Sequence, residues 1–148
     1  MPKSSSNARV ARDVAYVALG SNLGDRQGML SRARDAVAVL PGVRVLGVTA
    51  VEETAPLGGA AQPAYLNQMM AIETEYAPRA LLAALHDIEA QLGRVRGDRW
   101  ASRTIDLDLV LMEQQQSADP HCTVPHPGLQ DRDFWQRELA ELRALVRG

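Results

Sequence analysis

Two acidic residues, Asp106 and Asp108, lie two positions apart in segment 104–112, where apolar and polar residues mostly alternate. This alternation predicts a β-strand, so both carboxylates point to the same side of it. Two ionised carboxylates at this spacing repel one another, and a hard divalent cation relieves the repulsion. Many enzymes that act on phosphates hold a pair of metal ions ~3.5–4 Å apart in this way. The alternative is a strand with a solvated acidic face, and the spacing alone does not decide between the two.

Four arginines precede this pair in the chain: Arg94, Arg96, Arg99 and Arg103. The planar guanidinium group can bind two phosphate oxygens at once. Carboxylates with arginines beside them therefore suit a metal-bound polyphosphate. The alternative is that these arginines pair with nearby aspartates at the surface, which would contribute about 0–1 kcal/mol per pair.

Three further positions combine rings with polar groups. Tyr65 and Asn67 share one face of a predicted strand, and a ring beside an amide suits a flat heterocycle, although an edge-of-core tyrosine would give the same pattern. Trp100 lies in a charged loop, where a structural anchor is the simpler interpretation and a ligand cover the alternative. His126 lies between two prolines, and a lone histidine of this kind is more often structural or exposed than functional.

The elements that must position these residues follow from the hydrophobic periodicity and the turn residues. They are a strand at 14–19, a helix at 26–40, a strand at 43–51 with a phase shift at Gly47 that indicates a bulge, a loop at 53–62, a strand at 65–75, a helix at 78–92 capped by Gly93, a strand at 104–112, a polar segment at 113–120, a loop at 123–133 and a helix at 134–146. Met69, Ala71 and Ile72 should point inward. This order predicts the α+β class: a ferredoxin-like βαββαβ sandwich with an antiparallel sheet, helices on one face, and a C-terminal helix.

The composition excludes several classes of protein. The 148 residues suit one domain, which we place at 14–148 after a flexible N-terminal tail at 1–13. The formal net charge of −2 is too balanced for bulk attraction to nucleic acid or to an anionic membrane. Cys122 is the only cysteine, so no internal disulfide can form. No apolar run reaches the ~20 residues of a membrane span and no secretory signal is present, so we expect a cytoplasmic protein.

Taken in order along the chain, the motifs resemble those of the 6-hydroxymethyl-7,8-dihydropterin pyrophosphokinase family. The matching segments lie within 14–134 and are 17–24 (VALGSNLG), 54–58 (TAPLG), 62–67 (QPAYLN), 88–89 (IE), 93–96 (GRVR), 99–100 (RW), 103–109 (RTIDLDL) and 124–127 (VPHP), followed by Arg132 and Phe134. Each motif alone is a weak signal, but the ordered set is highly specific.

The resemblance implies an enzyme of folate biosynthesis that transfers pyrophosphate from ATP to the hydroxymethyl group of the pterin and releases AMP. It implies the ferredoxin-like fold and two Mg²⁺ ions, held by Asp106 and Asp108. It makes Arg94 and Arg103 the arginines that stabilise the transferring phosphates. The implied ATP-binding residues are Glu89, Arg96, Trp100, Leu109, Thr123, His126 and Arg132. The implied pterin-binding residues are Thr54, Pro56, Leu57, Tyr65, Asn67, Trp100 and Phe134, with the pterin stacked between Tyr65 and Phe134.

Three residues depart from the family's pattern, and they bear on the ATP contacts. Ala55 stands where a proline is usual, His86 where a glutamine is usual, and His121 where an arginine is usual. We expect a monomer whose partners are the two small-molecule substrates, with no nucleic acid and no membrane. Two alternatives remain: a catalytically weakened paralogue that binds pterin or nucleotide as a sensor, and a ferredoxin-like RNA-binding module that stacks bases on sheet aromatics.

Overall fold

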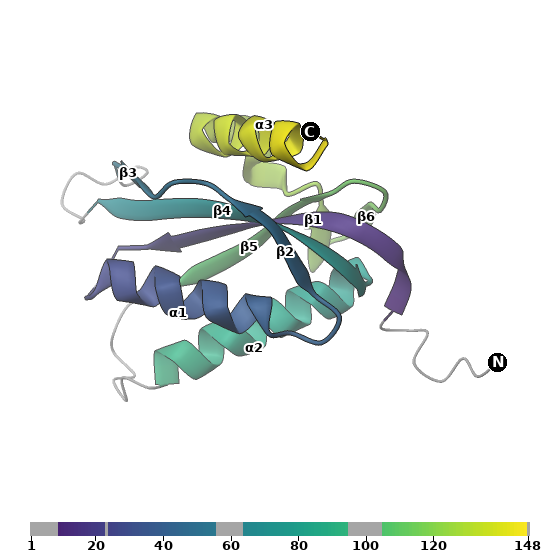
Figure 1. Ribbon diagram of the computed structural model, residues 1–148, viewed down its shortest axis with the longest axis horizontal. Coiled ribbons are helices and arrows are strands. Elements are labelled where there is room, and N and C mark those ends of the chain that lie inside the picture. Colours follow the sequence, from purple (N-terminus) through teal and green to yellow (C-terminus); the bar gives the residue numbers. More distant parts are fainter. Residues whose placement is uncertain (1–8, 23, 56–63, 95–104, 148) are drawn as a thin grey trace.

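The computed structural model describes residues 9–22, 24–55, 64–94 and 105–147 (Figure 1). Its helices and strands, in chain order, are β1 (Arg9–Ser21), α1 (Arg26–Ala38), β2 (Arg44–Val48), β3 (Glu52–Thr54), β4 (Tyr65–Tyr76), α2 (Pro78–Arg94), β5 (Asp106–Met112), β6 (Ser117–Asp119), β7 (Cys122–Val124), the 3-10 helix η1 (Pro127–Asp131) and α3 (Asp133–Arg147).

The main sheet has five strands, and every pair in it is antiparallel. The order is β2-β4-β1-β5, and β3 pairs with the part of β4 that carries Asn67. β6 and β7 form a separate two-stranded sheet. β1 is hydrogen-bonded along both edges, to β4 and to β5, so the residues of these three strands face one another at fixed positions.

Helices cover both faces of the main sheet (Figure 1). On one face α1 and α2 bury Leu30 and Leu85 against strand residues such as Leu107. On the other face α3 buries Trp135 and Leu142, and neighbours such as Leu139, against Tyr16, Ala18, Met69 and Ala71. The two helices predicted to cover the sheet do share one face. The C-terminal helix, also predicted, adds a second core on the opposite face, because its apolar stripe needs a partner of its own.

β4 contributes to both cores. Met70 and Ile72 are buried beneath α1 and α2, whereas Met69 and Ala71 are buried beneath α3. The residues predicted to point inward are therefore buried, but toward two different cores, since successive strand residues alternate between faces. A strand covered on both sides has no polar face, which is why its sequence is apolar over most of its length.

β5 places the two aspartates as the alternation predicts. Leu107 and Leu109 enter the core beneath α1 and α2, and Asp106 and Asp108 take the α3 face. The pairing with β1 shifts register between Tyr16 and Val17, which is a bulge on the β5 side. The predicted alternation is wrong beyond this point, because Leu111 packs with the α3 core while Met112 enters the other.

The first strand begins at Arg9 rather than at residue 14, so the tail predicted at 1–13 is wrong for residues 9–13. Polar contacts hold this part of the strand. The Arg12 guanidinium pairs with Glu73 and Glu75 of β4, and the Asp13 carboxylate accepts a hydrogen bond from the Gln114 N–H at 3.1 Å. Such long-range partners cannot be read from a polar local composition. Residues 1–8 lie outside the described residues.

Two loop predictions are also wrong in part. The loop expected at 53–62 overlaps β3, because Glu52–Thr54 pairs with the edge of β4. The polar segment at 113–120 and the loop at 123–133 contain the β6–β7 hairpin and η1. The strand expected at 43–51 is β2 alone, and its register shift between Val45 and Gly47 confirms the bulge. Short elements of this kind form through pairing, so their local sequence signals them weakly.

The residues at the helix ends show how each helix begins and stops. α1 begins after Asp25, whose carboxylate accepts the Gly28 N–H at 3.0 Å, and α2 begins at Pro78, where a missing N–H costs little. Gly93 is not a cap: α2 continues to Arg94, and Gly24 and Gly42 are the described glycines with a left-handed backbone. None of the helices in the described part of the chain is long and apolar enough to cross a membrane.

Candidate active site

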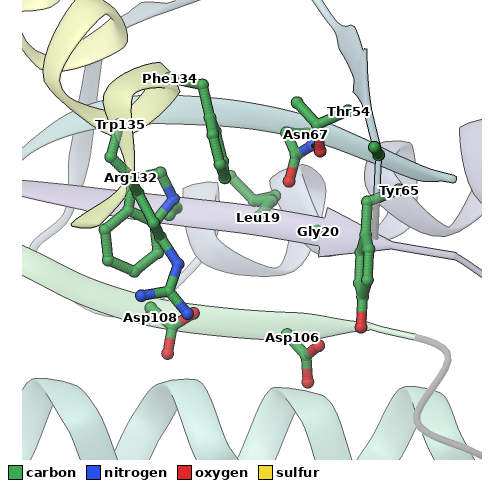
Figure 2. A pocket seen from close by; sticks show the side chains of 12 residues that line it. Leu19, Gly20, Thr54, Tyr65, Asn67, Asp106, Asp108, Arg132, Phe134 and Trp135 are labelled. Carbon is green, nitrogen blue, oxygen red and sulfur yellow. Dashed lines mark hydrogen bonds between the residues drawn. The ribbon is translucent and has the colours of Figure 1, made fainter. Parts of the chain in front are cut away.

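A hollow of about 160 Å³ opens on the α3 face of the sheet where β1 carries its smallest residues (Figure 2). We call it the ring cavity. Gly20 pairs with Asn67 on one side and with Asp106 on the other, and Ala18 pairs with Asp108. Paired residues share a face of the sheet, so these side chains surround the same space. The ring cavity is lined by Ala18, Leu19, Gly20, Thr54, Ala55, Tyr65, Asn67, Asp106, Asp108, Arg132, Phe134 and Trp135.

The floor of the ring cavity depends on Gly20. A Cβ atom there would lie 3.4 Å from Asn67 Oδ1 and 3.6 Å from Tyr65 Cδ1. Any larger side chain would therefore occupy the cavity. The Asn67 side-chain amide donates to Thr54 Oγ1, which joins β3 to β4 and leaves its carbonyl oxygen beside Gly20.

Aromatic rings form two opposing walls. Figure 2 shows Phe134, from the start of α3, and Tyr65, from the start of β4, on opposite sides of Gly20 and Asn67. A flat ring inserted between them would meet two aromatic surfaces and, at its edge, the polar groups of Asn67 and Thr54. This is the arrangement that the resemblance implies for the pterin.

The two predicted metal ligands form a third side of the ring cavity. Asp106 and Asp108 both line it, and the Asp108 side chain is 40% exposed. Asp108 also lines a second hollow of about 230 Å³, which we call the histidine cavity. The carboxylate of Asp108 therefore lies on the boundary between the two spaces.

The histidine cavity lies between α2, β5, β7 and the segment that follows β7. Leu109, Thr123 and His126, three predicted ATP-binding residues, line it together with His86 and His121, two of the departures from the family pattern. Cys122 also lines it, and burial raises the pKa of its thiol. Burial of this kind makes a thiol a poor nucleophile.

Hydrogen bonding fixes the orientation of the His126 ring. Its Nδ1 accepts the Gly128 N–H at 2.9 Å, so the proton of the neutral ring resides on Nε2. That nitrogen lies 3.6 Å from Asp108 Oδ1. His126 thus presents an N–H toward the boundary between the two cavities.

Trp135 is a site residue that the sequence analysis missed. Its buried ring makes an edge contact with His126, with the two ring centroids 5.0 Å apart. The Arg132 guanidinium carbon lies 4.5 Å from the centre of the same indole ring, and Arg132 also donates to the Gly128 carbonyl at 3.2 Å. Trp135 therefore orients a histidine and an arginine at once. Its adjacency to Phe134, in a chain with few aromatics, was the one available signal.

Two predicted ATP-binding residues, Arg132 and Glu89, do not line the histidine cavity. Arg132 lines the ring cavity, near the aspartates. The Glu89 carboxylate accepts the backbone N–H of Leu107 at 2.7 Å, so it positions the strand between Asp106 and Asp108. The predicted residues Pro56, Leu57, Arg96, Trp100 and Arg103 lie outside the described residues, as does the side chain of Arg94.

The family-model match and the curated relatives agree with one another. The family model for 7,8-dihydro-6-hydroxymethylpterin-pyrophosphokinase matches residues 16–144. A Pseudomonas aeruginosa protein named 2-amino-4-hydroxy-6-hydroxymethyldihydropteridine pyrophosphokinase is 43% identical over 132 residues, which cover 89% of this chain and 82% of that one. A Methylorubrum extorquens protein of the same name is 42% identical over 128 residues, covering 86% and 81%. The longer Schizosaccharomyces pombe "Folic acid synthesis protein fol1" is 39% identical across 87% of this chain and 18% of its own length. With nearly the whole domain matched and the ring cavity in place, this chain belongs to the 7,8-dihydro-6-hydroxymethylpterin-pyrophosphokinase family.

Proposed function

We propose that this chain performs the reaction for which its family is named, as an ATP-dependent pyrophosphokinase of folate biosynthesis. The hydroxymethyl oxygen of 6-hydroxymethyl-7,8-dihydropterin attacks the β-phosphorus of ATP and loses its proton. The bond from the β-phosphorus to the oxygen that bridges it to the α-phosphorus breaks, and AMP leaves with that oxygen. The observation that supports this most is the position of Asp108, which lines both cavities. One of them, the ring cavity, suits a flat ring, and the other, the histidine cavity, contains three of the expected ATP-binding residues.

The ring cavity is the proposed pterin site. Tyr65 and Phe134 stack on the two faces of the pterin, and such aromatic pairs contribute about 0.5–1.5 kcal/mol beyond the area they bury. Asn67 and Thr54 hydrogen-bond to its polar edge, because their own mutual bond leaves acceptor capacity on both. Pro56, Leu57 and Trp100 complete this site in the proposal.

Asp106 and Asp108 suit Mg²⁺. This ion is usually held by one or two carboxylates together with waters and substrate phosphates, rather than by a full set of protein ligands. The described residues contain no group of three or more acidic, histidine or cysteine side chains that could hold a metal ion by themselves. When bound, two Mg²⁺ ions would neutralise charge on the phosphate oxygens. The contribution of the chain is a pair of carboxylates on one strand: both line the ring cavity, and Asp108 also lines the histidine cavity.

The histidine cavity is the proposed nucleotide site. Leu109, Thr123 and His126 line it, and the His126 Nε2–H points toward the region where phosphates would meet Asp108. Arg132, Arg94, Arg96 and Arg103 supply positive charge to the phosphates, and Glu89 acts through the backbone of β5. Transfer of this kind depends on positioning and charge neutralisation more than on a strong base, so no general base is assigned.

The finer aspects of the fold belong to the same proposal. The strand order and the βαββαβ sequence of the main elements support a ferredoxin-like topology. We place the catalytic domain at 9–148 and expect a cytoplasmic monomer. Helices lie over both faces of the sheet (Figure 1), and the opening described on the α3 face is the ring cavity of about 160 Å³, which is small for a series of stacked bases and argues against an RNA-binding module.

The test is AMP formation from ATP, measured with hydroxymethyl-dihydropterin, Mg²⁺, or both left out in turn. We expect AMP only when all are present. Asp87→Asn, an exposed carboxylate on α2, is the matched control for Asp108→Asn. Tight binding of pterin or ATP without any AMP would favour the sensor paralogue instead.

A further inference from the structure

Glu138 is a buried carboxyl group that the proposed reaction does not use. Its side chain faces the sheet from the first half of α3 and is 3% exposed. Within the described part of the chain, neither of its carboxyl oxygens receives a hydrogen bond from a donor. An ionised carboxylate in such a place would carry an uncompensated desolvation cost, so the protonated form is favoured.

Glu52 of β3 is the neighbour that gives this proton a partner. The carboxyl groups of Glu52 and Glu138 lie next to one another, and a hydrogen bond between them requires that one of them carries a proton. Glu52 is the more exposed of the two, and its carboxylate already accepts from the Arg137 guanidinium at 3.1 Å. The shared proton is therefore assigned to Glu138, the more buried of the two. Burial, followed by the proximity of Glu52, raises the pKa of Glu138 to about 8.

The other groups around this pair can be named element by element. On α3, Arg137 favours ionisation of Glu138 and Glu141 opposes it. On β4, the residues on the α3 face nearest to β3 are Asn67 and Met69, which do not titrate, and Tyr65, at the far wall of the ring cavity. β2 contributes the apolar Leu46 and η1 the apolar Leu129, and Arg132, which follows η1, is held on the Trp135 ring. The proton shared with Glu52 is thus the main local means of neutralising the Glu138 carboxylate.

β3 is the element that this proton holds. It is three residues long, and Glu52 pairs with Asn67 while Thr54 pairs with Tyr65. The same short strand therefore carries the acceptor for Glu138 at one end and the Thr54 hydroxyl of the ring cavity at the other. A change in the contact between α3 and Glu52 should therefore shift Thr54, two residues away, at the polar edge of the proposed pterin site.

We propose that Glu138 is a positioning residue for the pterin: its protonated carboxyl donates to Glu52 and thereby fixes β3, with Thr54 and Asn67, against α3. Loss of this proton places two negative charges side by side beneath α3 and loosens the wall of the ring cavity. The proposal rests on the proposed function of that cavity. It predicts that pterin affinity falls in alkaline solution through a group that never touches the pterin.

The variant that tests it is Glu138→Gln, whose amide N–H replaces the carboxyl O–H and never ionises. We expect the Kd and KM for the pterin to match those of the parent at pH 6.5. At pH 9 the parent should bind the pterin about fivefold or more weakly than Glu138→Gln. Dividing the Kd of the parent by that of Glu138→Gln at each pH cancels the effect of the pterin's own titration. The KM for ATP and kcat should not follow this ratio. Glu138→Leu, which lacks a donor, should show the weak pterin binding at both pH values, and Glu141→Gln on the same helix should behave as the parent.

Unfolding free energy against pH supplies a readout independent of any ligand. Because the folded pKa of Glu138 lies above its unfolded value, the parent should lose stability relative to Glu138→Gln as pH rises from about 4.5 to 8. Parallel stability curves for these two proteins, or pterin affinities that change equally with pH in both, would overturn the inference. Absence of pterin binding at every pH, with diverging stability curves, would instead overturn the proposed function and leave the shared proton in place.

Discussion

At the end of the sheet away from the cavities, Glu113 follows β5 and accepts two hydrogen bonds from the Arg143 guanidinium, at 2.7 and 2.8 Å, and one from the buried Tyr16 hydroxyl, at 2.8 Å. At the other end of the same face, Asp108 faces the His126 ring across 3.6 Å and opens onto both cavities. Both carboxylates are set by β5 and lie beside β1. The first is enclosed by donors of its own chain, and the second is presented to whatever enters the cavities.

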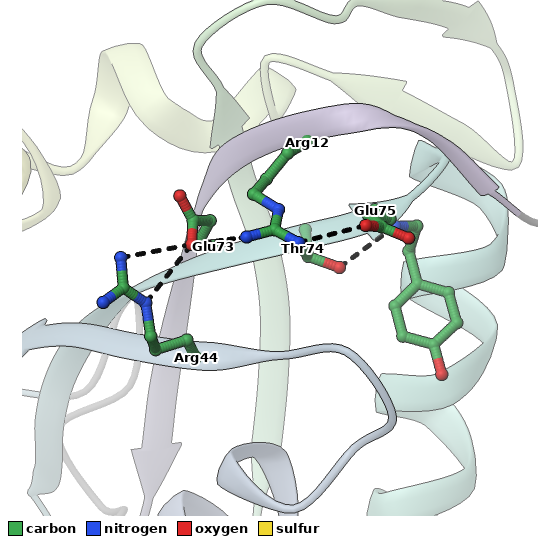
Figure 3. A network of polar contacts seen from close by, with 6 residues as sticks. Arg12, Arg44, Glu73, Thr74 and Glu75 are labelled. Atoms are coloured by element: carbon green, nitrogen blue, oxygen red, sulfur yellow. Dashed lines mark hydrogen bonds and ion pairs between the residues drawn. The ribbon is translucent and has the colours of Figure 1, made fainter.

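The donors at the distal end have clear electrostatic effects. Hydrogen bonding to Arg143 lowers the pKa of Glu113, and burial together with Glu113 raises the pKa of Tyr16. A second distal cluster joins Arg12 and Arg44 to Glu73 and Arg12 to Glu75 (Figure 3). The comparison shows that one sheet face can carry acidic residues for two purposes. Arginine partners make the distal carboxylates structural, and small neighbours on β1 make the proximal ones accessible.

The largest effect should come from neutralising the accessible carboxylates. Asp106→Asn and Asp108→Asn should each lower turnover by about 100- to 1000-fold, because charge on the transferring phosphates loses its counterpart. Tm without ligands should stay the same or rise, since two neighbouring negative charges become one. Steady-state AMP formation and thermal unfolding measure the two effects. Near-normal turnover in either variant would mean that the carboxylates at the cavities, like those at the distal end of the sheet, do not serve the reaction.

The converse change is Arg143→Ala at the distal end. It leaves Glu113 and the Tyr16 hydroxyl with fewer partners, so we expect a loss of about 2–3 kcal/mol of unfolding free energy. Turnover at 25 °C should change less than twofold, because no cavity is touched. Chemical denaturation and the AMP assay check this, and a selective loss of turnover would show that the distal cluster serves the reaction.

Acid titration sharpens the same contrast. The folded pKa of Glu113 lies below its unfolded value, so the stabilisation from this group is complete above about pH 4.5 and is lost as pH falls through the folded pKa. The parent should therefore lose stability below pH 4.5 more steeply than Arg143→Ala. Equal slopes of stability against pH in the two proteins would mean that the hydrogen bonds from Arg143 to Glu113 contribute nothing to stability in solution.

Two glycines provide a smaller, paired test. Gly20→Ala brings a Cβ to 3.4 Å from Asn67 Oδ1 and should weaken pterin binding by about tenfold, since one methyl group in a pocket is worth about 1–3 kcal/mol. Gly47→Ala brings a Cβ to 2.8 Å from Leu145 Cδ2, the end of a half-exposed side chain that can move. It should cost less than about 1 kcal/mol of stability and leave pterin affinity unchanged. Calorimetric titration with the pterin distinguishes them.

The smallest effect should come from Arg44→Ala. The Arg44 side chain is 72% exposed and its guanidinium pairs with Glu73 at 3.2 Å, so its removal should change the unfolding free energy by about 0–1 kcal/mol. The difference should shrink as salt is added. A larger loss of unfolding free energy that does not depend on salt would show that the cluster of Figure 3 stabilises the fold as strongly as the Arg143–Glu113 contact does.

Sequence reasoning named seven of the twelve residues that line the ring cavity, because that part of the argument was local. The two-residue spacing of Asp106 and Asp108, and of Tyr65 and Asn67, fixes which side chains share a face whatever the rest of the chain does. The family motifs then assigned roles that the spacing left open. Helix existence was equally local, since the stripes of α1, α2 and α3 are periodic.

The features that were missed depend on registry between distant segments. Gly20 is the floor of the ring cavity because it pairs with both Asn67 and Asp106, and nothing within β1 alone indicates those partners. Trp135 and Glu138 point to the sheet because α3 covers its second face, which the linear pattern does not specify. β3 exists through its pairing with β4.

The central position of β1 has a kinetic consequence. Its register joins Ala15 to Ile72 of β4 and to Met112 of β5, so both neighbours come from far along the chain. Such non-local pairing makes folding slow, because long loops must close before the pairing stabilises them. The ring cavity draws Gly20, Asn67 and Asp106 from three separate strands, so it is complete only after the last of them has joined. Substrates should therefore retard unfolding and leave the folding rate nearly unchanged.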